Sequence, residues 1–176
     1  IVFGDWSSDV CSSDLGVGAF DNGMENLKRL GFIPLLNKKV LNEKIPILGI
    51  CLGMQLLSQS SEEGKLPGLG WVKGKTIKFN LSDINLRIPH MGWNQIQIQK
   101  NSSLFKDFQQ SFEEIEFYFV HSYHVVCEDP TDIAATCTHG IDFVCAVEKE
   151  NIFATQFHPE KSHKFGMKLI KNFVEI

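Results

Sequence analysis

Hydrophobic positions recur at helical spacing near both ends of the chain and alternate with polar positions in its middle. Residues 20–43 are predicted to be helical, and Gly31 and Pro34 are expected to divide the segment into two pieces. Residues 162–176 form an amphipathic pattern, with Ser162 as the N-cap. The residues on its apolar face are Phe165, Leu169, Ile170 and Phe173. These patterns predict helices at both ends.

The middle of the chain has the pattern of half-buried strands. The stretches "TIKFNL" and "WNQIQIQ", within residues 71–98, alternate apolar and polar side chains. A shorter apolar strand is expected at 45–50, directly before a helix. Further strands are predicted at 115–126, 133–137, 142–148 and 152–157. Helices flanking a strand-rich centre predict a three-layer α/β domain with a sheet that mixes parallel and antiparallel strands.

Composition narrows the class of protein. A chain of 176 residues that is 43% hydrophobic is long enough for one domain, and we expect a single domain over 1–176. The formal net charge of −4 argues against nucleic acid or an anionic membrane as the main partner. No 18-residue apolar span or secretory signal is present, so we expect no membrane segment.

The five cysteines are odd in number and form no C-x-x-C pair, which favours a reducing, cytoplasmic compartment. Two pairs have spacings that could suit a metal, Cys137 with His139 and His121 with His124. No second pair stands at zinc spacing, so we expect neither a metal nor another cofactor.

Residues 5–15, "DWSSDVCSSDL", do not share the composition of the rest of the chain. They contain a near-repeat and show neither helical nor strand periodicity. Our hypothesis is that they are the translation of a sequencing-adapter oligonucleotide joined to a truncated gene. The alternative is an ordinary loop rich in serine and aspartate. The chain begins at Ile1 without a methionine, and we expect native sequence to be missing upstream.

The stretch "ILGICLGMQLL", residues 47–57, places a cysteine between a strand-like and a helix-like run. Gly49 and Gly53 flank Cys51 at the spacing of a nucleophile elbow, with sulfur in place of oxygen. This turn would place the thiol at a helix N-terminus, where the thiolate is favoured. The alternative is a small buried core residue, which free cysteines usually are. The stretch alone leaves both interpretations open.

The stretch "TQFHPEKS", residues 155–162, offers a base for such a thiol. His158 follows a predicted strand, and Glu160 lies two positions later, on the same side of a nearly extended backbone. The carboxylate can orient one imidazole nitrogen and leave the other facing the thiol. Taken singly, a surface histidine and a solvated glutamate are the simpler interpretation. Beside an elbow cysteine, the catalytic one is favoured.

Acyl transfer also needs donors for an oxyanion. The stretch "GVGAF", residues 16–20, leaves backbone exposed, so the N–H groups of Val17 and Gly18 are candidates. The N–H of Leu52, next to the nucleophile, is the second candidate donor. A tight loop before the first helix is the alternative for the glycine pair.

The motifs "GVGAF", "GICLGMQLL", "PHMGWNQ", "FYFVHSYHV" and "QFHPEKS", in this order, resemble the glutaminase subunits of imidazole glycerol phosphate synthases. These are class I, triad-type glutamine amidotransferases of histidine biosynthesis, and the resemblance covers residues 16–176. It implies a Cys51–His158–Glu160 triad and a three-layer fold with a mostly parallel mixed sheet. It also implies a set of contacts to the substrate glutamine: Gln55, Glu63, His121, Ser122 and Tyr123. Without it, Glu63 would be interpreted as an exposed acid and residues 121–123 as an edge strand.

The chain departs from this family at its start. Family members open with a strand and helix that are lacking here, and Leu15 replaces the proline of their Pro-Gly-Val-Gly loop. We expect this departure to affect the sheet edge and the oxyanion loop more than the triad.

The resemblance further implies that glutamine is hydrolysed to glutamate and that the ammonia passes to a (β/α)₈ cyclase subunit in a heterodimer. Four residues are candidates for that interface: Met91, Trp93, Tyr118 and Lys161. Core packing is the alternative for Trp93 and an ordinary surface position for Lys161. Three other functions remain open. They are a paralogous glutaminase supplying a cyclase-like partner in bacterial surface-sugar biosynthesis, a cysteine peptidase of similar fold, and a non-catalytic binding subunit.

Overall fold

The computed structural model describes residues 2–3, 19–83, 85–108 and 114–176. Segment 5–15 and the oxyanion candidates Val17 and Gly18 lie outside the described residues. The helices are α1 (Ala19–Arg29), α2 (Phe32–Leu36), the π-helix η1 (Asn37–Asn42), α3 (Leu52–Leu56) and α4 (His163–Val174). Three 3₁₀ turns accompany them: η2 (Ser103–Phe105), η3 (Pro130–Asp132) and η4 (Pro159–Lys161).

The strands overlap the regions in which the sequence predicts them, apart from the two-residue strands at 2–3 and 60–61, which the sequence pattern does not predict. The first five are β1 (Val2–Phe3), β2 (Ile47–Ile50), β3 (Ser60–Ser61), β4 (Gly74–Lys78) and β5 (His90–Ile98). The others are β6 (Glu116–His121), β7 (Tyr123–Cys127), β8 (Ile133–His139), β9 (Ile141–Lys149) and β10 (Ile152–Thr155). The main path of the sheet runs β1-β2-β10-β9-β7-β4-β3, and β5 joins it through β8 while pairing with β6.

The sheet is mixed, as predicted, but the expectation that it is mostly parallel is wrong. Among the described strands, only β1 with β2, β2 with β10, and β3 with β4 pair in parallel. The other pairs are antiparallel. The reason is the short connections from β8 to β9 and from β9 to β10, because tight turns can join only antiparallel neighbours.

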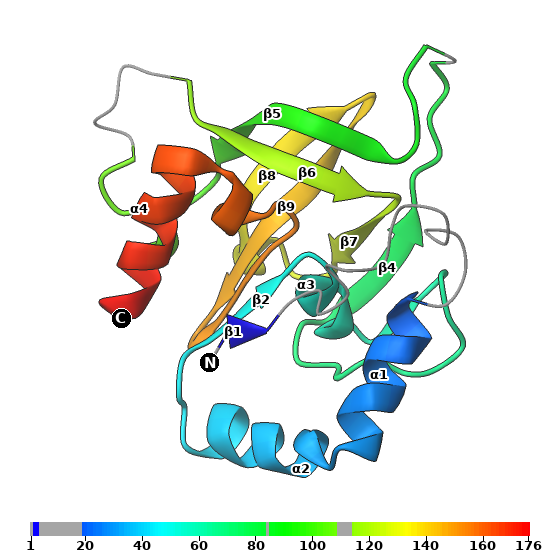
Figure 1. Cartoon of the computed structure of the whole chain (residues 1–176), viewed down its shortest axis with the longest axis vertical. Helices are drawn as coiled ribbons and strands as arrows, with labels where there is room; N and C mark the ends of the chain where they lie inside the picture. The colour runs from blue at the N-terminus through cyan, green and yellow to red at the C-terminus, as the bar shows by residue number, and fades with distance from the viewer. Residues whose placement is uncertain (1, 4–18, 84, 109–113) are drawn as a thin grey trace.

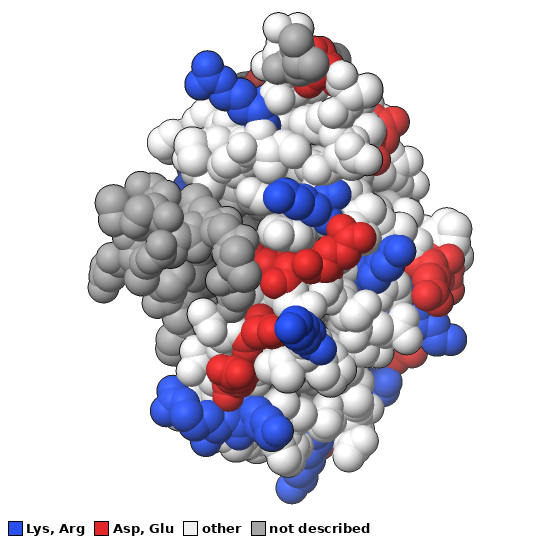
Figure 2. All heavy atoms as spheres, turned by 90° about the vertical axis from the view of Figure 1, so that its right-hand side faces the viewer, with Lys and Arg blue, Asp and Glu red and all other residues white. Residues whose placement is uncertain are grey.

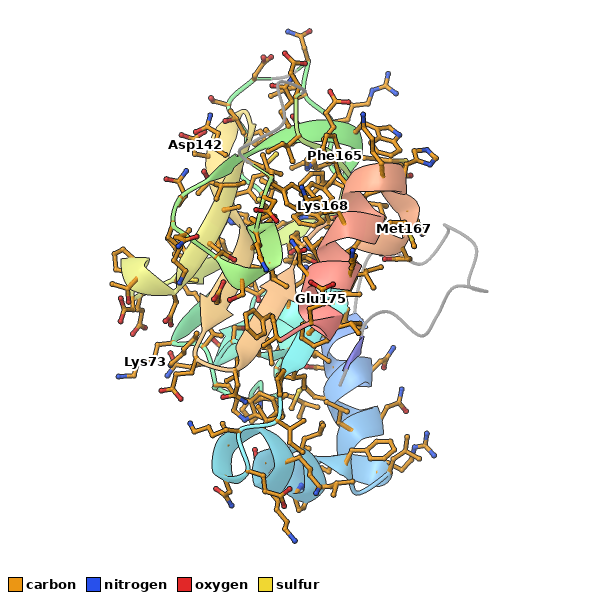
Figure 3. The ribbon with its side chains drawn as sticks, turned by 90° about the vertical axis from the view of Figure 1, so that its left-hand side faces the viewer. Lys73, Asp142, Phe165, Met167, Lys168 and Glu175 are labelled. Carbon is orange, nitrogen blue, oxygen red and sulfur yellow. The ribbon has the colours of Figure 1, made fainter. Side chains whose placement is uncertain are left out.

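Helices cover both faces of the sheet, which makes three layers (Figure 1). On one face, Leu169 and Phe173 of α4 pack against Phe153 and Phe157. Figure 3 shows α4 lying along the strands, with Phe165, Met167, Lys168 and Glu175 spaced along it. On the other face, Met54 of α3 joins a second buried cluster. Helix α1 covers α3 in turn, with Phe20 and Met24 packed on Leu56.

Two details of the helices differ from the sequence-based prediction. Gly31, with φ of 69°, separates α1 from α2 as expected. Pro34 does not break the helix, because it lies in the first turn of α2, where its missing N–H would have no intrahelical partner. Ser162 occupies the N-cap position of α4, but its side chain makes no capping hydrogen bond. Its hydroxyl serves the candidate active site instead.

Acidic and basic side chains are interspersed over the face of the molecule that Figure 2 presents. None of the helices in the described ranges is both long and apolar enough to cross a bilayer.

Candidate active site

Two neighbouring parallel strands bring the predicted nucleophile and base to the same edge of the sheet. Strand β10 pairs with β2 so that Thr155 lies opposite Ile50. Cys51 and Gln156 therefore leave the carboxyl ends of adjacent strands, and the Cys51 N–H donates to the Thr155 carbonyl at 2.8 Å. The carboxyl edge of parallel strands is where α/β proteins build sites.

Cys51 forms the sharp strand-to-helix turn that the two glycines predict. Its φ of 50° and ψ of −107° are strained for a residue with a Cβ, and α3 begins directly after it. A Cβ on Gly49 would lie 2.9 Å from the Gly53 carbonyl carbon and oxygen. The turn is therefore closed to any larger residue at position 49. The side chain of Cys51 is buried, which fits both interpretations of this cysteine, but the strained turn favours a functional one.

His158 and Glu160 interact as predicted. The His158 Nδ1 atom lies 2.7 Å from Glu160 Oε1. The histidine is buried, and its Nε2 atom is a buried nitrogen without a hydrogen-bond partner in the described part of the chain. One ring nitrogen is thus oriented by a carboxylate while the other remains available for proton transfer.

Ser162 holds this loop in place. The His158 N–H donates to the Tyr118 carbonyl at 2.9 Å, and the Tyr118 N–H donates to Ser162 Oγ at 3.0 Å. The Ser162 hydroxyl donates in turn to the His158 carbonyl at 2.6 Å. These three bonds tie the histidine to β6.

The electrostatics of the site favour a charged histidine. Burial alone would lower the pKa of His158, but interactions with Cys51 and Glu160 raise it to about 9. Burial has the largest single effect and raises the pKa of Glu160, but the hydrogen bond from His158, a backbone hydrogen bond and the charges of His158 and Lys161 together lower it, so the net change is downward. At neutral pH the pair is an imidazolium beside a carboxylate.

Gln156 is a part of the site that sequence reasoning missed. Its Nε2 atom donates to the Cys51 sulfur at 3.6 Å, and its side chain is completely buried. On the other side, the thiol lies 3.9 Å from the Val120 carbonyl oxygen at the end of β6. The only signal in the sequence was a buried polar residue two positions before His158, and that pattern is too common to single out.

The side chains of Gln55 and His121, both predicted to contact glutamine, are engaged within the protein. Gln55 Nε2 donates to the Tyr123 carbonyl at 3.2 Å and to Gln156 Oε1 at 3.1 Å. His121 Nδ1 lies 2.8 Å from the same carbonyl, and its Nε2 lies 3.1 Å from His90 Nδ1. Burial lowers the pKa of His121 to about 3.

Glu63 contacts the start of α1, and its charge acts on Tyr123. Glu63 accepts a hydrogen bond from the Phe20 N–H at 3.1 Å, and burial raises its pKa. The pKa of Tyr123 is raised by burial and then by the charges of Glu63 and Glu62. Ser122, between β6 and β7, is partly buried and its carbonyl accepts from the Phe79 N–H at 3.0 Å. Leu52 is the first residue of α3, a position whose N–H has no intrahelical acceptor.

A cysteine at a strained strand-to-helix turn, beside a buried histidine held by a carboxylate, is the arrangement of enzymes that transfer acyl groups through a thiol. The sequence model of the family "Glutamine amidotransferase class-I" matches residues 19–176. The chain belongs to the class I glutamine amidotransferase family.

Relatives of known name support the same family. The chain is 56% identical over 160 residues to "Imidazole glycerol phosphate synthase subunit HisH 2" of Methanococcus maripaludis. This match covers 91% of this chain and 77% of that protein. It is 48% identical over 163 residues to the HisH subunit of Leptospira borgpetersenii, covering 92% and 78%. It is 47% identical over 161 residues to HisH 2 of Pseudomonas aeruginosa, with the same coverage of 92% and 78%.

Solved structures agree on the fold. One described as a glutamine amidotransferase superimposes with a TM-score of 0.61 at 14% identity, covering 85% of this chain and 69% of that one. The structure of PurLQS from Thermotoga maritima gives a TM-score of 0.55 at 20% identity, covering 78% of this chain and 64% of that one. The predicted class I amidotransferase fold is confirmed.

Proposed function

We propose that this chain is the glutaminase subunit of an imidazole glycerol phosphate synthase, a single amidotransferase domain that hydrolyses glutamine to glutamate and ammonia. The observation that carries the proposal is the geometry around His158, on the loop that follows the strand beside Cys51. Glu160 lies 2.7 Å from Nδ1, and the buried Nε2 has no hydrogen-bond partner among the described residues. The names of the relatives at 47–56% identity supply the particular reaction.

In the first half of the reaction, the Cys51 thiolate attacks the side-chain amide carbon of glutamine. The negative charge that develops on the amide oxygen is stabilised by the Leu52 N–H, and Val17 or Gly18 supplies the second donor. His158, charged at neutral pH because its pKa is about 9, then gives a proton to the departing nitrogen. Ammonia leaves and a glutamyl thioester remains on Cys51.

In the second half, water hydrolyses the thioester. His158 is neutral after giving up its proton, so it can accept one from the attacking water. Glu160 keeps the ring oriented throughout, which is the role we assign to its 2.7 Å contact with Nδ1. Glutamate is released and the thiolate–imidazolium pair is restored.

The glutamine pocket in this proposal is built around Glu63, Ser122 and Tyr123. Glu63 and Tyr123 lie close enough for the Glu63 charge to raise the pKa of the phenol. Gln55 and His121 border the same pocket, but their side-chain nitrogens already bind protein atoms. We therefore assign them to shaping the pocket, while Glu63 and the backbone at 122–123 contact the substrate.

The ammonia goes to a cyclase subunit of (β/α)₈ type that forms a heterodimer with this chain, and we place both in the cytoplasm. The predicted interface residues form one surface cluster on β5, β6 and η4. Trp93 lies opposite Tyr118, with ring centroids 6.1 Å apart, and Lys161 Nζ lies 6.0 Å from the Tyr118 ring. Met91 and Trp93 are 58% and 46% exposed, which is unusual for large apolar side chains in a strand.

The test is glutamate release from glutamine by the protein alone and with a co-expressed cyclase from the same genome. We expect release that increases with the cyclase and falls on the order of 10³-fold or more in Cys51→Ala. Cleavage of peptide reporters without glutamine would indicate a peptidase, and no release in either setting would indicate a binding subunit. Stimulation only by a cyclase-like protein from a surface-sugar gene cluster would favour the paralogous glutaminase.

A further inference from the structure

Polar side chains, most of them buried, form a continuous chain of hydrogen bonds from strand β5 toward the active site. Asn94 Nδ2 lies 3.2 Å from His90 Nε2, and His90 Nδ1 lies 3.1 Å from His121 Nε2. His121 Nδ1 lies 2.8 Å from the Tyr123 carbonyl oxygen. Both histidines are at most 5% exposed, so each nitrogen needs a protein partner and finds one in this chain.

The Tyr123 carbonyl at one end and the Asn94 amide at the other determine which atom donates in each of these hydrogen bonds. The Tyr123 carbonyl only accepts, so His121 must carry its hydrogen on Nδ1 and, when neutral, accept at Nε2. His90 must then donate from Nδ1 and accept at Nε2 from the Asn94 amide. Burial lowers the pKa of His90 to about 4 and that of His121 to about 3, which is consistent with two neutral rings.

The same carbonyl begins the second half of the chain. Gln55 Nε2 donates to the Tyr123 oxygen at 3.2 Å and to Gln156 Oε1 at 3.1 Å. Because Gln55 presents its donor group, the Gln156 amide is fixed with its oxygen toward Gln55 and its NH₂ toward the Cys51 sulfur, 3.6 Å away. Gln55 is 5% exposed and Gln156 is completely buried, so neither can exchange these partners for bulk water.

We propose that Gln156 is a catalytic residue whose amide stabilises the Cys51 thiolate, and that Gln55, His121, His90 and Asn94 are positioning residues that hold it in this orientation. The proposal rests on Cys51 being the nucleophile. Two groups contact the sulfur and have opposite effects on its protonation. The Val120 carbonyl, at 3.9 Å, can only accept a hydrogen bond and so favours the protonated thiol. The Gln156 N–H favours the thiolate, and it faces the sulfur because Gln55, which must donate to the Tyr123 carbonyl, also donates to the Gln156 oxygen.

The first residues of the hydrogen-bonded chain share strand β5 with the exposed cluster of the proposed cyclase interface. His90 and Asn94 alternate along β5 with Met91 and Trp93. A partner that docks on Met91 and Trp93 and shifts this strand changes the Asn94–His90 contact, and the hydrogen bonds transmit the change to the sulfur.

The first test measures alkylation of Cys51 by iodoacetamide against pH in the full chain without glutamine, followed by mass spectrometry of the Cys51 peptide. Gln156→Met keeps the approximate volume but removes the donor. We expect the midpoint of its alkylation profile to rise by about one pH unit relative to that of the wild-type protein. Gln97→Leu, at an exposed position of β5, is the control and should leave the profile unchanged.

Gln55→Glu provides a second variant of almost unchanged shape, in case Gln156→Met does not fold. The ionised carboxylate can only accept, so above its pKa the Gln156 amide turns its NH₂ toward it and presents oxygen to the sulfur. The midpoint should rise at least as far as in Gln156→Met. An unchanged profile in a folded form of either variant would overturn the proposal.

The hydrogen-bonded chain from Asn94 to Gln156, here called the relay, is tested by determining the tautomers of its two histidines. In ¹⁵N-labelled protein we expect His90 and His121 to be neutral Nδ1–H tautomers at pH 7. His121→Phe, which keeps a ring but removes both nitrogens, should raise the Cys51 midpoint by less than Gln156→Met does. His139→Phe is the matched control, since His139 stacks on His90 with ring centroids 4.2 Å apart but bonds to the Arg87 carbonyl outside the relay. An Nε2–H tautomer at either relay histidine would contradict the inference.

These outcomes are separable from those of the proposed function. If wild-type protein hydrolyses glutamine but Gln156→Met keeps the wild-type alkylation profile, only the further inference fails. If wild-type protein releases no glutamate, the proposed function fails whatever the profile shows.

Discussion

The backbone N–H of Phe20 donates a 3.1 Å hydrogen bond to the side chain of Glu63, 43 positions later in the chain. The neighbouring Asp21 completes the connection, because its carboxylate accepts from the Lys65 and Leu66 N–H groups. The first turn of α1 and the segment after β3 are therefore held together by bonds in both directions. We therefore expect a change to either carboxylate to alter the geometry of the proposed glutamine pocket.

Replacing Glu63 by alanine removes both the acceptor of the Phe20 N–H and a carboxylate of the proposed pocket. We expect KM for glutamine to rise on the order of tenfold and the free energy of unfolding to fall by about 1 kcal/mol. Steady-state kinetics and urea unfolding measure the two effects.

Glu62→Ala is the matched control, because Glu62 accepts a similar 2.9 Å bond from the Lys78 N–H on β4. It should affect stability without raising KM by the same factor. Equal KM values in the two variants would remove Glu63 from the pocket.

Gly49→Ala tests how tightly the strand-to-helix turn at Cys51 is packed. In Gly49→Ala the new Cβ meets the Gly53 backbone at 2.9 Å, and backbone cannot move aside as a side chain can. We expect a loss of about 1–3 kcal/mol in unfolding free energy and a lower kcat, since Cys51 must shift.

Gly23→Ala in α1 is the control, because its Cβ meets only Leu side chains at 3.0–3.4 Å, which can adjust. Urea unfolding compares the two. If Gly49→Ala were as stable as Gly23→Ala, the elbow would not be as tightly packed as the structure indicates.

Part of this site could be predicted from sequence because it depends on local geometry. Gly49, Cys51 and Gly53 lie within one turn, and His158 and Glu160 are two positions apart, so each motif can be recognised locally, and the two motifs together favour the catalytic interpretation. The hydrophobic pattern correctly predicts a mixed sheet, whereas the mostly parallel sheet that the family resemblance implies is wrong, because neither source records which strands return by a tight turn. The expectation that Pro34 divides the helix is wrong because the effect of a proline depends on its position within the helix, and Pro34 lies in the first turn of α2.

The Gln156 contact could not be predicted in the same way. It joins residues more than a hundred positions apart along the chain, and it depends on the register that places Thr155 opposite Ile50. A one-residue slip would turn Gln156 away from the sulfur. No periodicity or motif specifies that register, so the sequence alone does not distinguish Gln156 from any other buried polar residue.

Trp93→Ala tests the proposed docking surface. The Trp93 ring stacks on His163 at 5.0 Å with an interplanar angle of 5°, which holds it in place on the surface. A pre-ordered aromatic ring loses little entropy on binding, so we expect the substitution to weaken cyclase binding roughly tenfold or more. Calorimetric titration with the purified cyclase provides the measurement.

Met167→Ala is the control for docking. Met167 is 68% exposed on α4 and is not one of the four predicted interface residues, so its loss should leave the dissociation constant unchanged. If the two variants bind the cyclase equally well, the partner docks elsewhere.

Glu160→Gln tests whether Glu160 stabilises the charged form of His158, which can be measured as a change in the pH dependence of stability. The pKa of His158 is raised from 6.5 to about 9, so its contribution to stability is complete below about pH 6.5 and is lost as pH rises through 9. Glu160 provides part of that contribution, and because its side chain is 47% exposed we discount the effect to about 1 kcal/mol. The variant should therefore be less stable than wild type at pH 6 and nearly equal to it at pH 10, as measured by urea unfolding. The amide can also donate to Nδ1 and select the wrong tautomer, so kcat should fall on the order of 10²–10⁴-fold. A stability difference that is the same at both pH values would show that Glu160 supports the loop without influencing the charge of His158.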